Sequence, residues 1–188
     1  MNRAWTRRRL MHTTLVSGLG LAGARLAFAQ GEAVSESPAA ERVITLFNTH
    51  TRETVRAAYR RGESLDPAAL GQLRNVLRDH RNGHSHDIDT GLYDQLHDLA
   101  LAARCEAHYE IISGYRSPES NAKMAAASSG VAKKSLHMEG RAIDVRLRGC
   151  SCADLRDLAI EARRGGVGYY QRSDFVHLDT GRFRTWNG

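Results

Sequence analysis

Short runs of alternating apolar and polar residues recur along the chain, and this period of two is typical of β-strands. Two of these runs, 43–47 and 54–59, are joined by a polar stretch and predict a hairpin. Further strands are predicted at 109–113, 142–147, 168–170 and 175–178. These strands provide the framework on which any rigid site would be built.

Other segments place apolar residues at helical spacing. One helix is predicted to begin at Asp66 and Pro67, because Asp can cap a helix and Pro fits its first turn. Three more are predicted at 91–103, at 118–128 and at 152–164, the last ended by Gly165-Gly166. Helices and strands do not alternate regularly, so we predict an α+β fold with a central antiparallel sheet and flanking helices, in one domain over 41–188.

The first 29 residues have the organisation of an export signal. A basic start is followed by an apolar run from Leu15 to Leu26 and by the small residues Ala27 and Ala29, which suit a signal peptidase. Arg7-Arg8-Arg9 before Leu10-Met11 resembles a twin-arginine signal, which implies contact with the Tat export machinery and a periplasmic location. The apolar run is too short for a stable membrane anchor. Residues 30–40 have no periodicity and predict a disordered leader.

Net charge gives no reason to expect a nucleic-acid partner. The whole chain carries +6, but the predicted signal holds five arginines and no acids, so 22 basic and 21 acidic side chains remain after its removal. Nucleic-acid binding usually requires a concentrated basic surface.

Three cysteines remain in the mature part. In an oxidising compartment Cys105 could pair with Cys150 or with Cys152, or all three could be ordinary thiols. A metal site at Cys150-Ser151-Cys152 is disfavoured because no second Cys or His pair accompanies it.

The stretch from Ser135 to Asp144 contains the chemistry that stands out. His137 and Asp144 lie seven residues apart around Gly140, and His177 follows on a later predicted strand. Two imidazoles and one carboxylate form a ligand set for one zinc ion that keeps its fourth position for water. Asp174, three residues before the last ligand, is in position to activate that water.

Strand alternation explains how these ligands could meet. Asp144 alternates with the apolar Ile143 and Val145, so it points away from their face, and His177 alternates with its neighbours in the same way. Gly140 allows the preceding loop to fold back and bring His137 to this face. The alternative is that these are unrelated polar residues on solvated strands.

The chain resembles the zinc peptidases of the D-alanyl-D-alanine carboxypeptidase type, peptidase family M15, and within them the murein endopeptidase K-like branch. The resemblance covers roughly 43–186, in Phe47–Thr51, Leu77–Arg81, Ser113–Ser117, Ser135–Asp144 and Phe175–Asp179. It implies His137, Asp144 and His177 as zinc ligands and a catalytic carboxylate three residues before the last ligand. Many relatives have Glu there, whereas this chain has the shorter Asp174, which leaves Asp179 as an alternative base.

Two further residues are candidates for the site. Arg116 follows a strand in a tight turn and would stabilise the oxyanion and bind substrate, a role that the resemblance supports; otherwise it is an exposed arginine on a turn. Ser135 is either a substrate hydrogen-bond partner or a local cap. The histidines at 80, 84 and 86 lie in a polar loop, which is read as solvated, with a second metal site as the alternative. No role is assigned to His50, His97 or His108.

Together these features predict an exported zinc metallopeptidase, with one zinc ion per chain, that cuts amide cross-links of peptidoglycan. Two alternatives remain. A D,D- or L,D-carboxypeptidase would need a basic pocket, for which Arg116, Lys133, Lys134 or Arg141 are available. A zinc-stabilised wall-binding module without turnover would instead have its fourth metal position filled by a protein side chain.

Overall fold

The computed structural model describes residues 40–127, 132 and 134–188. The predicted signal peptide, residues 30–39 of the predicted leader, the loop at 128–131 and Lys133 lie outside the described residues. Within the described ranges, no helix is both long enough and apolar enough to cross a membrane.

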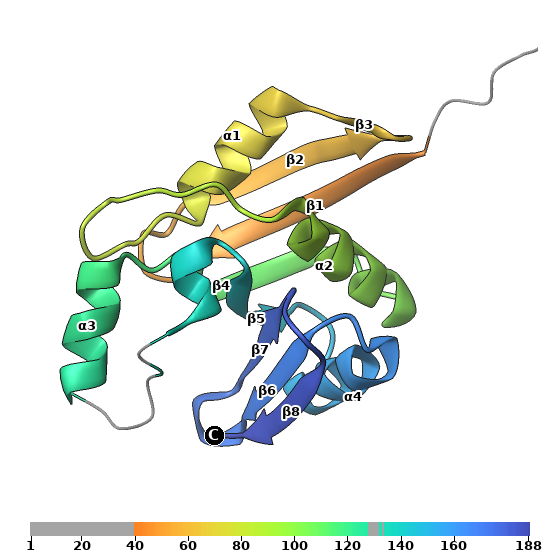
Figure 1. The fold of residues 1–188 in the computed structure, drawn as a ribbon. Helices are drawn as coiled ribbons and strands as arrows, with labels where there is room; N and C mark the ends of the chain where they lie inside the picture. The colour runs from red at the N-terminus through yellow and green to blue at the C-terminus, as the bar shows by residue number, and fades with distance from the viewer. Residues whose placement is uncertain (1–39, 128–131, 133) are drawn as a thin grey trace, which may run out of the picture. The chain divides into compact units, whose positions relative to one another are not determined.

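The structure is built on one mixed sheet of eight strands, in the order β3-β2-β1-β4-β5-β7-β6-β8 (Figure 1). Five neighbouring pairs are antiparallel, whereas β1 with β4 and β6 with β8 are parallel. The strands are β1 Glu41–Asn48, β2 Thr54–Arg61, β3 Ser64–Leu65, β4 His108–Ser113, β5 Ala142–Leu147, β6 Gly166–Tyr170, β7 Phe175–Asp179 and β8 Arg184–Asn187. The α+β class and the β1–β2 hairpin are confirmed.

The helices begin at side-chain caps. Asp66 accepts hydrogen bonds from the backbone N–H groups of Ala68 and Ala69 at the start of α1, and Asp89 and Ser151 cap α2 and α4. The helices are α1 Pro67–Val76, α2 Thr90–Ala102, α3 Pro118–Ala127 and α4 Cys152–Ala162, with short 3₁₀ turns at η1 Leu136–Glu139 and η2 Gln171–Ser173.

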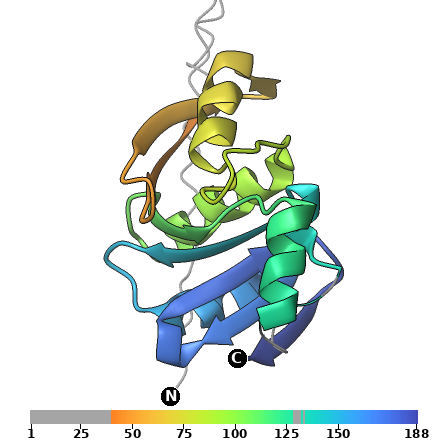
Figure 2. The same cartoon turned by 90° about the vertical axis from the view of Figure 1, so that its left-hand side faces the viewer.

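One hydrophobic core joins the sheet to α1, α2 and α4. Ile143 and Val145 of β5 and Leu178 of β7 are completely buried in it, together with Leu73 of α1 and Leu155 of α4. Alternation then turns the intervening residues of β5 and β7 to the other face of the sheet. The helix α3 lies on the opposite side of the C-terminal strands from α4 (Figures 1 and 2).

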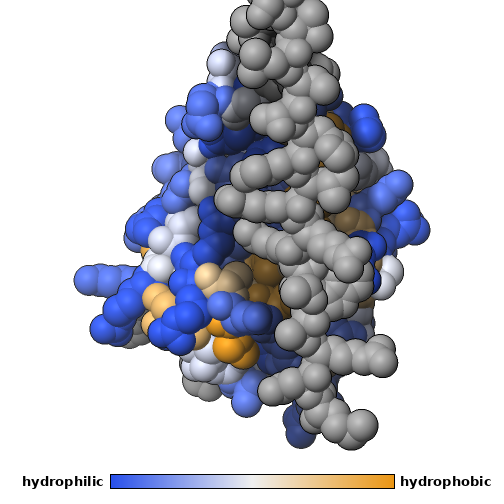
Figure 3. All heavy atoms as spheres, turned by 90° about the vertical axis from the view of Figure 1, so that its right-hand side faces the viewer, coloured by the Kyte–Doolittle hydropathy of each residue, from blue (hydrophilic) through white to orange (hydrophobic). Residues whose placement is uncertain are grey.

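Few large hydrophobic residues are exposed in the described part of the chain, namely Leu65 and Leu101. Where grey residues do not cover it in Figure 3, the side that carries α2 and α4 is mostly hydrophilic, with a few hydrophobic areas.

Two details at the C-terminal end differ from the sequence predictions. Helix α4 ends at Arg163, whose left-handed backbone (φ 52°) forms the cap, and not at the glycines that follow. Gly165 and Gly166 instead pack against Asp179. A Cβ on either glycine would lie within 2.4 Å of an Asp179 atom, so this close approach requires glycine. Strand β8, which was not predicted, forms the edge of the sheet next to β6.

Candidate functional site

His137, Asp144 and His177 come from three neighbouring elements. Asp144 on β5 is the direct cross-strand partner of His177 on β7, so their side chains point to the same face. His137 lies on η1, which is capped by Ser135 and ended by Gly140 in a left-handed conformation (φ 65°). Gly140 therefore makes the fold-back that brings His137 to the strands.

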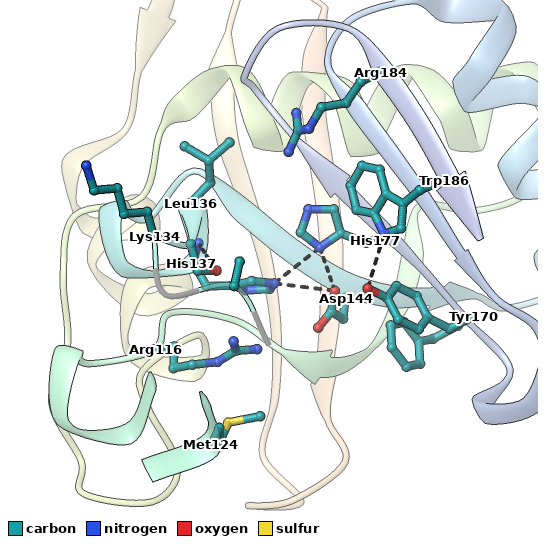
Figure 4. A pocket seen from close by; sticks show the side chains of 13 residues that line it. Arg116, Met124, Lys134, Leu136, His137, Asp144, Tyr170, His177, Arg184 and Trp186 are labelled. Carbon is teal, nitrogen blue, oxygen red and sulfur yellow. Dashed lines mark hydrogen bonds and ion pairs between the residues drawn. The ribbon is translucent and has the colours of Figure 1, made fainter. Parts of the chain in front are cut away.

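The three side chains converge on one point. One ligand atom from each residue lies within 4.8 Å of the other two. Nδ1 of His177 is 2.9 Å from Oδ1 of Asp144 and 3.3 Å from Nε2 of His137. All three residues are buried to at least nine-tenths, and Figure 4 shows their side chains pointing toward one another. We call this group the His-Asp-His triad.

The second nitrogen of each imidazole is held by an oxygen of the protein. Nδ1 of His137 donates to the Gly114 carbonyl at 2.8 Å, and Nε2 of His177 donates to Asp179 Oδ2 at 3.1 Å. Because each of these nitrogens carries its ring's proton, Nε2 of His137 and Nδ1 of His177 present lone pairs to the Asp144 carboxylate. Three acceptors that face one another attract a cation, so the residues fit a divalent metal.

Electrostatics in the triad also favour positive charge. Burial raises the pKa of Asp144, but the adjacent His137 and His177 outweigh burial and hold that pKa below its usual range. Burial lowers the pKa of His177, but the charged imidazole could donate to both Asp144 and Asp179, and these hydrogen bonds give a net increase. A proton and a metal ion would therefore compete for this group of ligands.

Arg116 lies beside the triad and is only 7% exposed. Its backbone N–H donates to the His137 carbonyl at 3.1 Å, and its guanidinium contacts Asn121 at 3.2 Å. Its Nε has no hydrogen-bond partner among the described residues. Burial lowers the pKa of Arg116, and the charges of Asp144 and Tyr170 act in the opposite direction. The structure thus rules out an exposed arginine on a turn.

The loop between α1 and α2 positions the Arg116 turn. Asp79 is fully buried, and its carboxylate accepts from the backbone N–H groups of Ser117 at 2.9 Å and Arg81 at 3.1 Å. Burial raises the pKa of Asp79, but its hydrogen bonds outweigh burial and lower that pKa to about 2. The loop also fits closely to Gly114, where a Cβ would lie 2.5 Å from the Leu77 carbonyl oxygen.

A cavity of about 440 Å³ opens over the triad. Arg116, Ser135 and Lys134 line it, together with the triad and with Tyr170, Phe175, Arg184 and Trp186 on the opposite wall. Ser135 acts as a local cap, since its hydroxyl accepts from the His137 N–H at 3.4 Å. The cavity therefore opens the triad to molecules from solvent.

The two carboxylates considered as general base have different surroundings. Asp174 adopts a left-handed backbone (φ 50°), and its side chain is 71% exposed and lies 3.5 Å from Nε of Arg146. It lines a second cavity, of about 340 Å³, with Cys150 and Cys152. Asp174 is not among the residues that line the triad cavity. The structure therefore does not bring Asp174 together with the triad.

Asp179, the alternative base, is fully buried and its oxygens are already engaged. They accept from the backbone N–H groups of Gly166 and Gly181 at 2.8 Å, from His177 and from Arg184 at 2.6 Å. Asp179 consequently orients the His177 imidazole, and its engaged oxygens leave it poorly placed to activate water.

Two histidines of the polar loop contact other aromatic rings, and Arg141 lies outside the triad cavity. His80 stacks on His50 at 3.8 Å between ring centroids, and His86 stacks on Tyr115 at 5.2 Å. Within the described ranges, the triad is the one group of three potential ligands close enough to share an ion, so no second metal site is found at residues 80–86. Arg141 bonds Thr180 and Glu139 and does not line the triad cavity.

The three cysteines are free thiols in the structure. Burial raises the pKa of Cys152 to about 12, and its contact with Asp174 adds to that shift. Neither of the pairings that the sequence left open is formed.

Sequence reasoning missed the wall formed by Tyr170, Arg184 and Trp186. Trp186 lies over Gly168, where a Cβ would be 2.5 Å from the indole, and its ring centroid is 5.1 Å from that of His177. A glycine between two strand-forming residues is the signal that a large side chain from a neighbouring strand packs there.

Comparisons with known proteins agree with the geometry. A family model described as Peptidoglycan L,D-endopeptidase MepK matches residues 36–186. Peptidoglycan L,D-endopeptidase MepK of Escherichia coli (strain K12) is 42% identical over 145 residues, which cover 77% of this chain and 80% of the relative. Probable peptidoglycan L,D-endopeptidase MepK of Haemophilus influenzae is 38% identical over 149 residues, which cover 78% and 80%. No solved structure matches significantly. The resemblance found in the sequence is thereby confirmed, and the chain belongs to the MepK family of M15-type peptidases.

Proposed function

We propose that the protein is a zinc-dependent endopeptidase that hydrolyses the L,D amide cross-links of peptidoglycan, the bond named for its relatives. The observation that carries this proposal is the convergence of His137, Asp144 and His177 at the floor of an open cavity. Two imidazoles and one carboxylate favour zinc over magnesium or calcium. One ion per chain is expected, because the described residues contain one such triad.

The ion, when bound, would supply a Lewis acid and a water whose pKa is lowered towards about 7. The protein's own residues would orient the imidazoles and stabilise the charge that develops on the substrate. Gly114 and Asp179 would keep both imidazoles oriented through their second nitrogens. The buried cation of Arg116 would stabilise the negative oxygen that develops on the scissile carbonyl.

Asp174 is our candidate for the general base, on the strength of its position three residues before His177. It would take a proton from the attacking water and pass it to the leaving amine. Its side chain must first leave Arg146 and turn towards the triad. Because it is 71% exposed, this change of rotamer would cost little.

Three further residues bear on substrate binding. Ser135 lines the cavity, and its hydroxyl proton is still available after capping η1, so we propose it as a donor to the stem peptide. Lys134 and Arg184 add positive charge to the cavity from different sides, which suits the carboxylates of stem peptides.

A substrate in the cell wall implies an extracytoplasmic location. We propose the periplasm, reached through the twin-arginine signal at 1–29 and without a stable membrane anchor after its cleavage. Export after folding would allow the metal to be loaded inside the cell.

The test is mass spectrometry of purified cross-linked muropeptide dimers after incubation with the mature protein, with and without chelator. Two dimer preparations are compared, one joined directly between diaminopimelate residues and one joined through D-alanine. Metal-dependent conversion of the first to monomers is expected. Loss of a terminal residue without cleavage of the cross-link would indicate a carboxypeptidase, and binding without any product would indicate a wall-binding module.

A further inference from the structure

Tyr170 occupies the wall of the cavity that faces Arg116. It is on β6 directly opposite Phe175 of β7, and two residues from Gly168, the partner of His177. Strand alternation therefore puts Tyr170 on the same face as the triad. In Figure 4 the triad lies between Arg116 on one side and Tyr170 with Trp186 on the other.

Two contacts hold the Tyr170 ring in place. It stacks on Phe175 with 4.5 Å between ring centroids and 14° between ring planes. Nε1 of Trp186 lies 3.2 Å from the Tyr170 hydroxyl oxygen. Trp186 reaches this position because Gly168 has no side chain beneath the indole. A held side chain loses less entropy when it makes a further hydrogen bond.

The contact with Trp186 also fixes the direction of the Tyr170 hydroxyl. An indole N–H can only donate, so the phenol oxygen is the acceptor in this hydrogen bond. The phenol proton is then left for another acceptor, and in the described part of the chain no protein acceptor is bonded to it. Tyr170 therefore offers the cavity a fixed donor.

Peptide hydrolysis creates a hydrogen-bond acceptor within the active-site cavity. When water adds to the amide carbonyl, the carbonyl oxygen becomes a tetrahedral oxyanion, and donors that are already oriented stabilise it without reorganisation. Arg116 supplies one donor at one side of the triad. On the opposite side, the guanidinium of Arg184 is paired with Asp179, and the other lining residues beside Tyr170 are the aromatic Phe175 and Trp186.

We propose that Tyr170 is a further catalytic residue, which donates its phenol hydrogen bond to the tetrahedral oxyanion opposite Arg116, and that Trp186 is a positioning residue for this donor. The inference rests on the peptidase activity proposed above. It requires no proton transfer and no additional reactant.

The experiment compares Tyr170→Phe, Trp186→Phe and the control Tyr169→Phe in the zinc-loaded mature protein. Tyr169 is the adjacent tyrosine, its ring is covered by Arg156, and alternation turns it to the other face of the sheet. Tyr170→Phe should lower kcat on cross-linked muropeptide dimers by about 10²-fold with little change in KM, as for loss of one oxyanion donor. Trp186→Phe should give a smaller loss of kcat, and Tyr169→Phe none.

A second readout does not depend on turnover. A phosphinate peptide, which imitates the tetrahedral state, should bind Tyr170→Phe at least about 10-fold more weakly than wild type, whereas uncleaved substrate analogue should bind both equally. Metal content and melting temperature are measured in every variant. Unchanged kcat and phosphinate affinity in Tyr170→Phe, with an active wild type, would overturn this inference alone. A loss that follows metal content would also overturn it.

A wild type that neither cleaves dimers nor binds the phosphinate would overturn the proposed function and this inference together.

Discussion

Nε2 of His177 and Oδ2 of Asp179 are 3.1 Å apart, on residues of one strand separated by Leu178. The two side chains share the face of the sheet that bears the triad, and the pair continues to Arg184, which contacts Asp179 at 2.6 Å. The final strand of the sheet is thereby connected to the ligand set. This connection makes the orientation of His177 depend on residues outside the triad.

Asp179→Asn should weaken metal binding by about 10–100-fold, because the substitution removes the charge that fixes the proton on Nε2 of His177. Competition with a chromogenic chelator measures this affinity directly. Asp157→Asn is the matched control, since that carboxylate is exposed and pairs with Arg156 on α4. Equal affinities for the two variants would contradict the supporting role of Asp179.

Replacement of any member of the triad by alanine should remove the metal. Three protein ligands are the minimum for an open zinc site, so His137→Ala, Asp144→Ala and His177→Ala should each reduce metal content from one per chain to near zero. Elemental analysis after dialysis gives the stoichiometry. His84→Ala, in the exposed loop before α2, should keep its metal. Full metal content in a triad variant would show that the ion binds elsewhere.

Asp174→Asn tests the general base and preserves the local backbone, because Asn tolerates the left-handed conformation found at this residue (φ 50°). We expect kcat to fall by about 10²–10⁴-fold and the free energy of unfolding to change by less than about 0.5 kcal/mol.

The companion variant Arg146→Ala frees the Asp174 carboxylate from its neighbour and should retain activity. Activity that survives in Asp174→Asn would exclude this residue as the base. The contact with Arg146 seen in the structure would then be the role of this side chain.

Asp79 should make stability depend on pH in the acidic range. Its pKa in the folded protein, about 2, is below the ordinary value of 3.8, so the folded state binds the proton less readily than the unfolded state. The stabilisation is present above about pH 4 and is lost as pH falls towards 2, and it amounts to about 2 kcal/mol.

Urea unfolding of the metal-free protein measures this effect. The difference in unfolding free energy between wild type and Asp79→Asn should be largest near neutral pH and should shrink as pH falls below about 4. A difference that stays constant across this range would mean that the Asp79 charge contributes nothing to stability.

Local sequence patterns were sufficient to predict most of the helices and strands. Asp66-Pro67 predicted the start of α1 because a cap and a fixed φ act within one turn of chain. Alternation in β5 predicted that Asp144 points away from Ile143 and Val145, and the structure agrees, because those two residues belong to the core and Asp144 to the triad. The triad was also predictable, since its spacing around Gly140 is contained in ten residues and only His177 is remote.

The tertiary structure decided everything that depends on which distant segments meet. Parallel pairing of β1 with β4 and of β6 with β8 joins strands separated by other elements, and no local period encodes that choice. The same pairing brings Arg184 and Trp186 to the triad cavity. The direction of the Asp174 side chain could not be predicted from the sequence either. Its left-handed backbone ends the strand alternation that would have indicated this direction.

The sequence by itself thus determined the side chains that the triad contains and the strands that carry Asp144 and His177, since both depend on near neighbours in the chain. Only the folded sheet determined which side chains support those ligands, because such contacts exist only once distant strands have paired.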